Sequence, residues 1–218
     1  MIKVIFFDFD GVIVESVDIK TAAFAELFKE ESKKHLAGIL DYHKKHGGVS
    51  RRNKIIYFYK NILRRELSDE TLQKIENRFS QYVKDKVIQA AFVKGAQEFI
   101  KANFNKYDFY IISGTPQQEL EEIIFRKNLS RYFLGVFGSP SAKSETINSL
   151  ISEKKYLRDD IVFIGDSTDD LEGAEKCGIR FIARVSPTGS NNFPSKKKFP
   201  VINDFHDLES ILSRPNTA

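Results

Sequence analysis

The sequence predicts an α/β protein: a doubly wound, Rossmann-like parallel sheet with an inserted helical cap domain. Three observations lead to this prediction. Short runs of β-branched and aromatic residues alternate with segments of helical periodicity in the C-terminal part of the chain. The first two predicted strands are separated by about 100 residues whose periodicity is helical. Polar or acidic residues follow the predicted strands at the ends where such sheets bind ligands.

Buried strands are expected where apolar, β-branched or aromatic residues form short runs closed by polar or turn residues. These runs are residues 4–7, 109–112, 135–137, 161–164, 180–183 and 201–202. The later runs alternate with three predicted helices, at residues 117–128, 143–151 and 169–177. Pro116 suits the first turn of one of them, because its fixed φ and missing N–H are tolerated there. Alternation of this kind favours parallel strands with helices on both faces.

The connection after the first strand is longer than a crossover helix requires. Apolar residues recur at helical spacing within it, at residues 19–35, 54–63 and 72–87. We therefore expect residues 16–90 to form a helical cap, and residues 1–15 and 91–218 to form the α/β core.

Composition excludes several classes of protein. The 218 residues are 41% hydrophobic and 29% charged, which is typical of a globular protein and not of a disordered chain, a collagen or a membrane channel. No stretch approaches the ~20 apolar residues of a membrane span, and the N-terminus is too acidic for a signal peptide. Cys177 is the single cysteine, so an internal disulfide and a cysteine-based zinc site are excluded, and a cytoplasmic location is expected.

Four aspartates follow two of the predicted strands. Asp8 and Asp10 come after the first strand, and Asp166 and Asp170 come after the fourth. The carboxyl ends of parallel strands share one edge of a sheet, so these carboxylates are expected to converge. Like charges at such short range need a cation, and oxygen ligands favour Mg²⁺.

Groups that suit a phosphate follow the strands between them. Ser113 or Thr115, the backbone N–H groups of the next helix, and Lys143 provide donors and a positive charge. Carboxylates, a metal and a phosphate cradle together indicate phosphoryl transfer. In that chemistry Asp8 serves as the nucleophile and Asp10 as the proton donor to the leaving oxygen.

The ordered set D-x-D-G, S-G-T, lysine and G-D-x-x-x-D resembles the four motifs of the haloacid dehalogenase superfamily, in particular its β-phosphoglucomutase and phosphoglycolate phosphatase group. The resemblance implies Mg²⁺ and an aspartyl-phosphate intermediate, with Asp8 as nucleophile and Asp10 as general acid/base. It also implies a metal held by Asp8, the backbone carbonyl of Asp10 and Asp166, with Asp170 acting directly or through water.

The same resemblance assigns the phosphate and the substrate. Ser113, Lys143 and the backbone of Gly114 are implied to bind phosphate. Arg51 lies in G-G-V-S-R, which is similar to a cap loop whose arginine reaches a distal phosphate or carboxylate. Lys20 stands where the mutases of this group carry a hinge histidine, which favours hydrolysis over mutase activity.

The sequence thus predicts a Mg²⁺-dependent phosphatase acting on a small phosphorylated metabolite. A sugar phosphomutase like β-phosphoglucomutase is the alternative enzyme. A nucleic-acid-binding module is the alternative from another class, because residues 16–93 carry 16 Lys and Arg against 10 Asp and Glu. Acidic residues are interspersed among these cations and no RNA-recognition motif is present, so we expect no nucleic-acid partner.

Overall fold

The computed structural model describes residues 1–187, 193–194 and 199–213. Its core is a six-stranded parallel sheet with the strand order β3-β2-β1-β4-β5-β6. The strands are β1 (Val4–Phe7), β2 (Asp108–Pro116), β3 (Gly135–Ser139), β4 (Ile161–Gly165), β5 (Arg180–Arg184) and β6 (Val201–Ile202). The α/β fold and each predicted strand are confirmed, because a buried strand carries a strong local signal of β-branched and aromatic residues.

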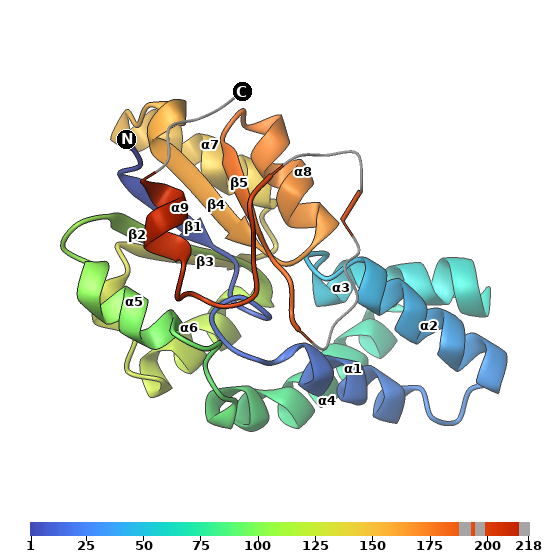
Figure 1. Cartoon of the computed structure of the whole chain (residues 1–218). Coiled ribbons are helices and arrows are strands. Elements are labelled where there is room, and N and C mark those ends of the chain that lie inside the picture. The colour runs from blue at the N-terminus through green and yellow to red at the C-terminus, as the bar shows by residue number, and fades with distance from the viewer. Residues whose placement is uncertain (188–192, 195–198, 214–218) are drawn as a thin grey trace.

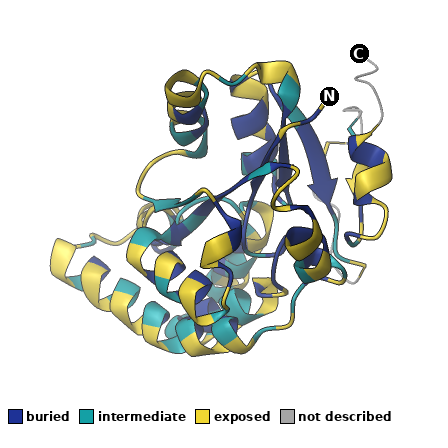
Figure 2. Cartoon of the chain, turned by 90° about the vertical axis from the view of Figure 1, so that its left-hand side faces the viewer, coloured by how far each residue is buried: buried dark blue, intermediate teal, exposed yellow. Residues whose placement is uncertain are grey.

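Helices cover both faces of this sheet, as Figure 1 shows. Successive residues of β1 point to opposite faces, so Ile5 and Phe7 pack in one apolar cluster and Val4 and Phe6 in the other. The first cluster includes residues of α5 (Ala96–Asn103), α6 (Gln117–Arg126) and α9 (Leu208–Leu212). The second includes residues of α7 (Lys143–Lys154) and α8 (Thr168–Lys176). Figure 2 shows the strands as a buried layer between these helices.

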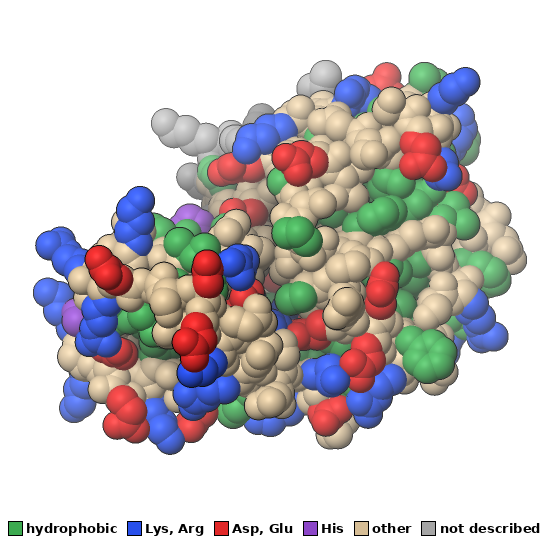
Figure 3. Space-filling view, turned by 180° about the vertical axis from the view of Figure 1, so that it is seen from behind, with side chains coloured by type: hydrophobic (Ala, Val, Ile, Leu, Met, Phe, Trp, Pro, Cys, Tyr) green, Lys and Arg blue, Asp and Glu red, His purple; other side chains and the backbone are tan. Residues whose placement is uncertain are grey.

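A helical cap lies between β1 and β2 in the sequence and to one side of the sheet in Figure 1. It consists of α1 (Val17–Leu27), α2 (Lys33–Lys45), α3 (Arg51–Tyr57), the π-helix η1 (Phe58–Leu63) and α4 (Asp69–Gln89). Its interior is aromatic: the ring of Phe24 packs against Phe58 and Phe79, with centroid separations of 5.2 and 4.5 Å. Figure 3 shows Lys and Arg interspersed with Asp and Glu on the outside of this cap.

The prediction of one helix over residues 19–35 was wrong. The structure ends α1 at Leu27 and begins α2 at Lys33. The Ser32 hydroxyl accepts a hydrogen bond from the His35 backbone N–H at 3.2 Å and so caps a new helix. Neither α2 nor α5 was predicted as a separate element. The limits of the cap at residues 16 and 90 stay a prediction.

Ion pairs join the cap to α6 of the core. Arg51 contacts Glu119 at 2.6 Å, and Lys84 contacts Glu122 at 3.0 Å. The first pair is buried, with side chains only 5% and 7% exposed. Buried pairs of this geometry resist separation more than surface pairs, so the Arg51–Glu119 contact fixes how α3 lies against α6. Among the helices of the described residues, none combines the length and the hydrophobicity that a membrane span requires.

Candidate active site

The site lies at the point where the order of the sheet reverses. From β1 the chain continues through the cap to β2 on one side, and β4 pairs with β1 on the other. Asp8 follows β1 and Asp166 follows β4, so both emerge at the carboxyl edge of the central strands. Gly11 makes this approach possible: its φ is +75°, and a Cβ there would lie 2.1 Å from Asp166 Oδ2.

Three carboxylates converge at this edge. Asp8, Asp166 and Asp170 each offer a ligand oxygen, and these oxygens lie within 4.8 Å of one another. Burial and the neighbouring carboxylates raise the pKa of Asp8 to about 6, although Lys143 opposes the shift. Burial, then Asp8 and Asp170, raise the pKa of Asp166 well above its ordinary value. An all-oxygen set with excess negative charge, in which Asp8 and Asp170 are buried and Asp166 is half-buried, fits a hard divalent cation.

Asp170 organises the loop that carries Asp166. Its Oδ2 accepts hydrogen bonds from the backbone N–H groups of Asp166 at 3.2 Å and Ser167 at 3.1 Å, and from the Ser167 hydroxyl at 2.7 Å. Its Oδ1 contacts the Lys143 ammonium. Because the fully buried Asp170 carboxylate accepts all these hydrogen bonds, it fixes the position of the loop that carries Asp166 and the position of Lys143.

Asp8 is held through one of its two oxygens. Asp8 Oδ1 accepts a hydrogen bond from the Phe9 backbone N–H at 2.8 Å and lies 3.1 Å from Lys143 Nζ. Within the described residues, Oδ2 has no protein donor. Burial opposes a charged lysine here, but Asp170 and Asp8 together raise the pKa of Lys143, so the ammonium persists between the two carboxylates.

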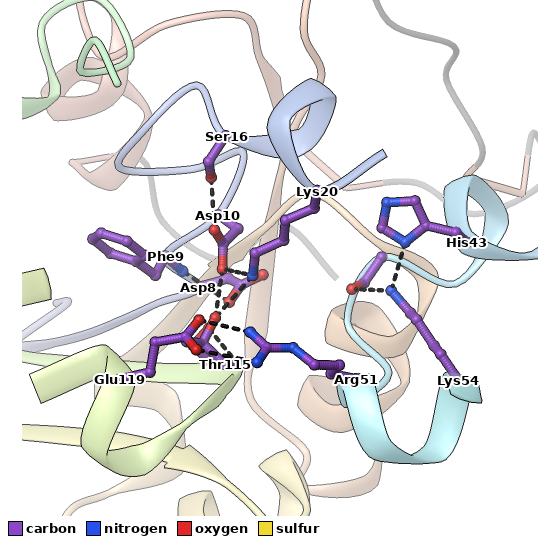
Figure 4. A network of polar contacts seen from close by, with 12 residues as sticks. Asp8, Phe9, Asp10, Ser16, Lys20, His43, Arg51, Lys54, Thr115 and Glu119 are labelled. Atoms are coloured by element: carbon purple, nitrogen blue, oxygen red, sulfur yellow. Dashed lines mark hydrogen bonds and ion pairs between the residues drawn. The ribbon is translucent and has the colours of Figure 1, made fainter. Parts of the chain in front are cut away.

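The Asp10 carboxylate lies apart from this triad and faces the cap. Its Oδ1 accepts from the Ser16 hydroxyl at 2.6 Å, and its Oδ2 accepts from the Thr115 hydroxyl at 2.8 Å and from Lys20 (Figure 4). Burial works to raise the pKa of Asp10, but the Lys20 ammonium and the hydrogen bonds from Lys20, Ser16 and Thr115 lower it. Whether the Asp10 carbonyl binds metal stays a prediction.

The residues predicted to bind phosphate lie beside this centre. Asp8, Asp10, Ser113 and Gly114 line one cavity of about 590 Å³. The Ser113 hydroxyl accepts from the Thr115 backbone N–H at 3.2 Å. The cap loop lies directly over Gly114, where a Cβ would be 2.9 Å from the Gly48 carbonyl oxygen. The cavity is therefore bounded by the cap as well as by the core.

Arg51 lines the same cavity, but its guanidinium is already paired. It makes two hydrogen bonds to the Glu119 carboxylate, at 2.6 and 3.1 Å, and one to the Ser80 hydroxyl at 2.5 Å. It also stacks over the Phe79 ring at 4.2 Å. The prediction that Arg51 contacts the substrate stays a prediction. No sequence motif identified Glu119 as the partner of Arg51, because the two residues are 68 positions apart and lie in different helices.

Sequence reasoning also missed three residues near the site. Arg184 donates to both carboxylate oxygens of Glu15 and to the Gly11 carbonyl oxygen at 3.0 Å. These hydrogen bonds stabilise the loop after β1. Lys54 and His43 form a buried pair in the cap, with Lys54 Nζ 3.1 Å from His43 Nδ1. Lys54 lies three residues after Arg51, but a lysine in a basic helix carries no signal of burial.

The haloacid dehalogenase-like hydrolase family model matches residues 5–184, a span that runs from the second residue of β1 to the end of β5 and contains every residue of the site. The chain belongs to this family. The doubly wound core, the cap after the first strand and the aspartate cluster are thus those of a haloacid dehalogenase-like hydrolase.

Relatives and solved structures of this family resemble the whole chain. A phosphoglycolate phosphatase of Sulfolobus acidocaldarius is 25% identical over 202 residues, which cover 84% of this chain and 83% of the relative. A structure described as a predicted phosphoglycolate phosphatase from Haemophilus somnus has a TM-score of 0.73 at 18% identity, covering 96% and 97% of the two chains. A magnesium-bound structure of YfnB from Bacillus subtilis, described as a putative haloacid dehalogenase-type hydrolase, has a TM-score of 0.70 at 17% identity, covering 98% and 99% of the two chains.

The raised pKa of Asp8 predicts that Asp8→Asn stabilises the metal-free protein. The pKa of the Asp8 carboxyl is about 6 in the folded chain and 3.8 ordinarily. The protonated carboxyl therefore favours the folded state fully below about pH 4, and this contribution to stability is lost as the pH rises through 6. At pH 7.5 with chelator, the variant should melt roughly 6–12 °C higher than the wild type. Calorimetry at pH 7.5 and pH 4 measures the difference, which should vanish at the lower pH.

The matched control is Asp159→Asn, which removes one charge from an exposed aspartate away from the cluster. It should leave the melting temperature unchanged at both pH values. A lower melting temperature for metal-free Asp8→Asn at pH 7.5 would show that the cluster is not strained by its own charge.

Proposed function

We propose that this hydrolase is a Mg²⁺-dependent phosphatase that hydrolyses a small phosphorylated metabolite through an aspartyl-phosphate on Asp8. The observation that carries the proposal is the environment of Asp8. One oxygen is held by Lys143 and the Phe9 N–H, the other has no protein donor among the described residues, and the side chain lines the cavity. That arrangement suits a carboxylate nucleophile oriented through a single oxygen.

In the first step Asp8 Oδ2 forms a bond to phosphorus and the bond from phosphorus to the substrate alcohol oxygen breaks. The leaving alkoxide takes its proton from the fraction of Asp10 that is protonated when the substrate binds, and this carboxyl lines the same cavity. Ser113, the Gly114 backbone and Lys143 are the groups proposed to bind the phosphoryl oxygens. Positively charged and N–H donors there stabilise the charge of the transition state.

In the second step a water attacks the aspartyl-phosphate and gives its proton to the Asp10 carboxylate, releasing inorganic phosphate and restoring Asp8. Lys20, Ser16 and Thr115 stabilise the ionised form of Asp10, which is the form that accepts this proton. Their contacts therefore favour the base that activates the attacking water.

The metal site proposed for Mg²⁺ consists of Asp8, Asp166 and Asp170, with the Asp10 carbonyl. The residues fit this ion: their oxygens lie within 4.8 Å of one another, and the pKa values of Asp8 and Asp166 are raised as expected for carboxylates short of positive charge. When bound, Mg²⁺ neutralises charge on the phosphoryl group and on the carboxylates. The magnesium-bound structure of YfnB supports this choice of metal.

The name of one relative supports a small substrate. The phosphoglycolate phosphatase of Sulfolobus acidocaldarius is named for a very small phosphorylated acid. A cavity of about 590 Å³, closed on one side by the cap, suits molecules of that class. A cytoplasmic location, predicted from the single cysteine, is consistent with such a substrate.

Phosphate release from 4-nitrophenyl phosphate tests the proposal. The wild type should hydrolyse it with Mg²⁺ and lose activity after exhaustive chelation. Asp8→Asn should have no measurable activity, because an amide is a poor nucleophile. Ca²⁺ should not restore the chelated enzyme, since it accepts more ligands at longer distances than the near-octahedral Mg²⁺.

The Asp159→Asn variant serves again as the control, and it should keep full activity because its exposed side chain lies outside the cavity. Phosphate release by Asp8→Asn above the level of a mock purification would rule out Asp8 as the nucleophile. Full activity after chelation would rule out the metal.

Lys20→Met is expected to move the acidic limb of the pH profile of kcat to higher pH. Lys20 lowers the pKa of Asp10, so removing the ammonium raises that pKa, and the basic form is then lost at a higher pH. The shift should be roughly 1 pH unit or more, as for an opposite charge in contact with a carboxylate. Lys45→Met removes a charge from an exposed lysine of the same cavity wall and should leave the limb in place. A shift to lower pH would contradict this role of Lys20.

A further inference from the structure

The guanidinium of Arg51 is engaged by the protein itself. Arg51 begins α3 of the cap, and its side chain is 5% exposed. The two terminal nitrogens donate to the Glu119 carboxylate and to the Ser80 hydroxyl, and the group lies over the Phe79 ring. Nε is buried and has no partner among the described residues. Arg51 therefore lines the cavity with its strongest donors already in a bidentate, charge-assisted pair.

Glu119 is committed to the same network from the other side of the domain boundary. Its side chain is 7% exposed, and its Oε2 accepts from the Ser80 hydroxyl at 2.6 Å as well as from Arg51. Arg51 and Ser80 belong to the cap, whereas Glu119 belongs to α6 of the core. Figure 4 shows the Arg51 and Glu119 side chains pointing toward one another. Separating them would leave two buried charges without partners, which is costly.

The pair lies next to the two segments that meet over the cavity. Arg51 directly follows the cap loop of residues 47–50, and Glu119 is in the first turn of α6, just after residues 113–115. These two segments approach each other so closely that a Cβ on Gly114 would lie 2.9 Å from the Gly48 carbonyl oxygen. Holding α3 against α6 therefore also holds the cap loop against the segment proposed to bind phosphate.

Two further ion pairs extend the contact between α4 and α6. Glu122 pairs with Lys84 at 3.0 Å, and Arg126 pairs with Asp85 at 2.8 Å. Positions 119, 122 and 126 share one face of α6 because they are three and four residues apart. The two outer pairs are exposed, with side chains 36–67% accessible, and such pairs contribute little. The buried pair is therefore the main electrostatic link along this face of the cap.

We infer that Arg51 is a positioning residue that fixes the cap on the core through Glu119, and that it is not a ligand of the substrate. The inference goes beyond the proposed function, because it concerns how the two domains are joined. It also replaces the role that the sequence motif implied for Arg51. A ligand of the substrate cannot be exchanged for an apolar side chain, whereas a buried ion pair often can be, provided that both partners are replaced together.

The test removes the two charges singly and together. We would measure kcat and KM of Arg51→Met, Glu119→Met and the double variant for 4-nitrophenyl phosphate and 2-phosphoglycolate. Each single variant leaves one buried charge unpaired, so kcat/KM should fall roughly 10-fold or more on both substrates. The double variant places two apolar side chains beside the Phe79 ring and should return to within roughly threefold of the wild type on both. The matched control, Lys84→Met with Glu122→Met, removes an exposed pair between the same domains and should change kcat/KM less than roughly twofold.

The double variant distinguishes the two roles of Arg51, whether or not the single variants fold. A folded double variant that loses activity on 2-phosphoglycolate would overturn the inference, because Arg51 would then be needed for itself. Folded single variants with wild-type rates would overturn it as well.

Hydrogen exchange measures the attachment of the cap without any turnover. The backbone amides of residues 47–57 should exchange roughly 10-fold faster in Glu119→Met than in the wild type, and at the wild-type rate in the double variant. Should Glu119→Met not fold, faster exchange of these amides in the double variant than in the wild type would contradict the inference, and so would equal exchange in all three proteins where all three fold. If the wild type hydrolyses neither ester, the proposed phosphatase is wrong, and hydrogen exchange alone decides whether Arg51 and Glu119 join the domains.

Discussion

The Lys143 ammonium lies between the carboxylates of Asp8 and Asp170, and the arrangement of the site depends on that contact. Asp8, Asp166 and Asp170 are gathered where the sheet order reverses, and burial makes their mutual repulsion costly. The Lys143 ammonium compensates part of this negative charge. The remaining excess is what makes the site suited to a divalent metal and to a nucleophile oriented through one oxygen.

The cap completes the cavity through contacts of a different kind. Its loop approaches the core closely enough that a Cβ on Gly48 would lie 2.7 Å from the Ser167 hydroxyl. Lys20 extends from α1 to Asp10, and Arg51 extends from α3 to Glu119. Asp10, the proposed general acid/base, is therefore held partly by the cap, so opening of the cap would change the environment of Asp10 as well as access to it. In the proposed mechanism, substrate binding and proton transfer are coupled through the same helices.

The sequence was sufficient for the features that depend on local pattern. Buried strands such as β1 are runs of β-branched and aromatic residues, and the motif aspartates follow them directly. The break between α1 and α2 was missed because apolar residues continue at helical spacing through Phe28, and only the Ser32 cap marks the new start. The partners of Arg51 and Lys54 could not be predicted from the sequence, for another reason. They are set by how α3 packs against α2 and α6, and no pattern within the basic segment separates a buried lysine from a solvated one.

The proposed mechanism requires that Asp8 becomes phosphorylated during turnover. Acid quenching of the wild type in the first turnovers with a ³²P-labelled phosphomonoester, followed by peptide mapping, measures this directly. We expect a transient, hydroxylamine-labile label on the peptide that contains Asp8, appearing before the release of phosphate reaches its steady rate. Turnover without any labelled protein, or a label on a peptide that lacks Asp8, would contradict it.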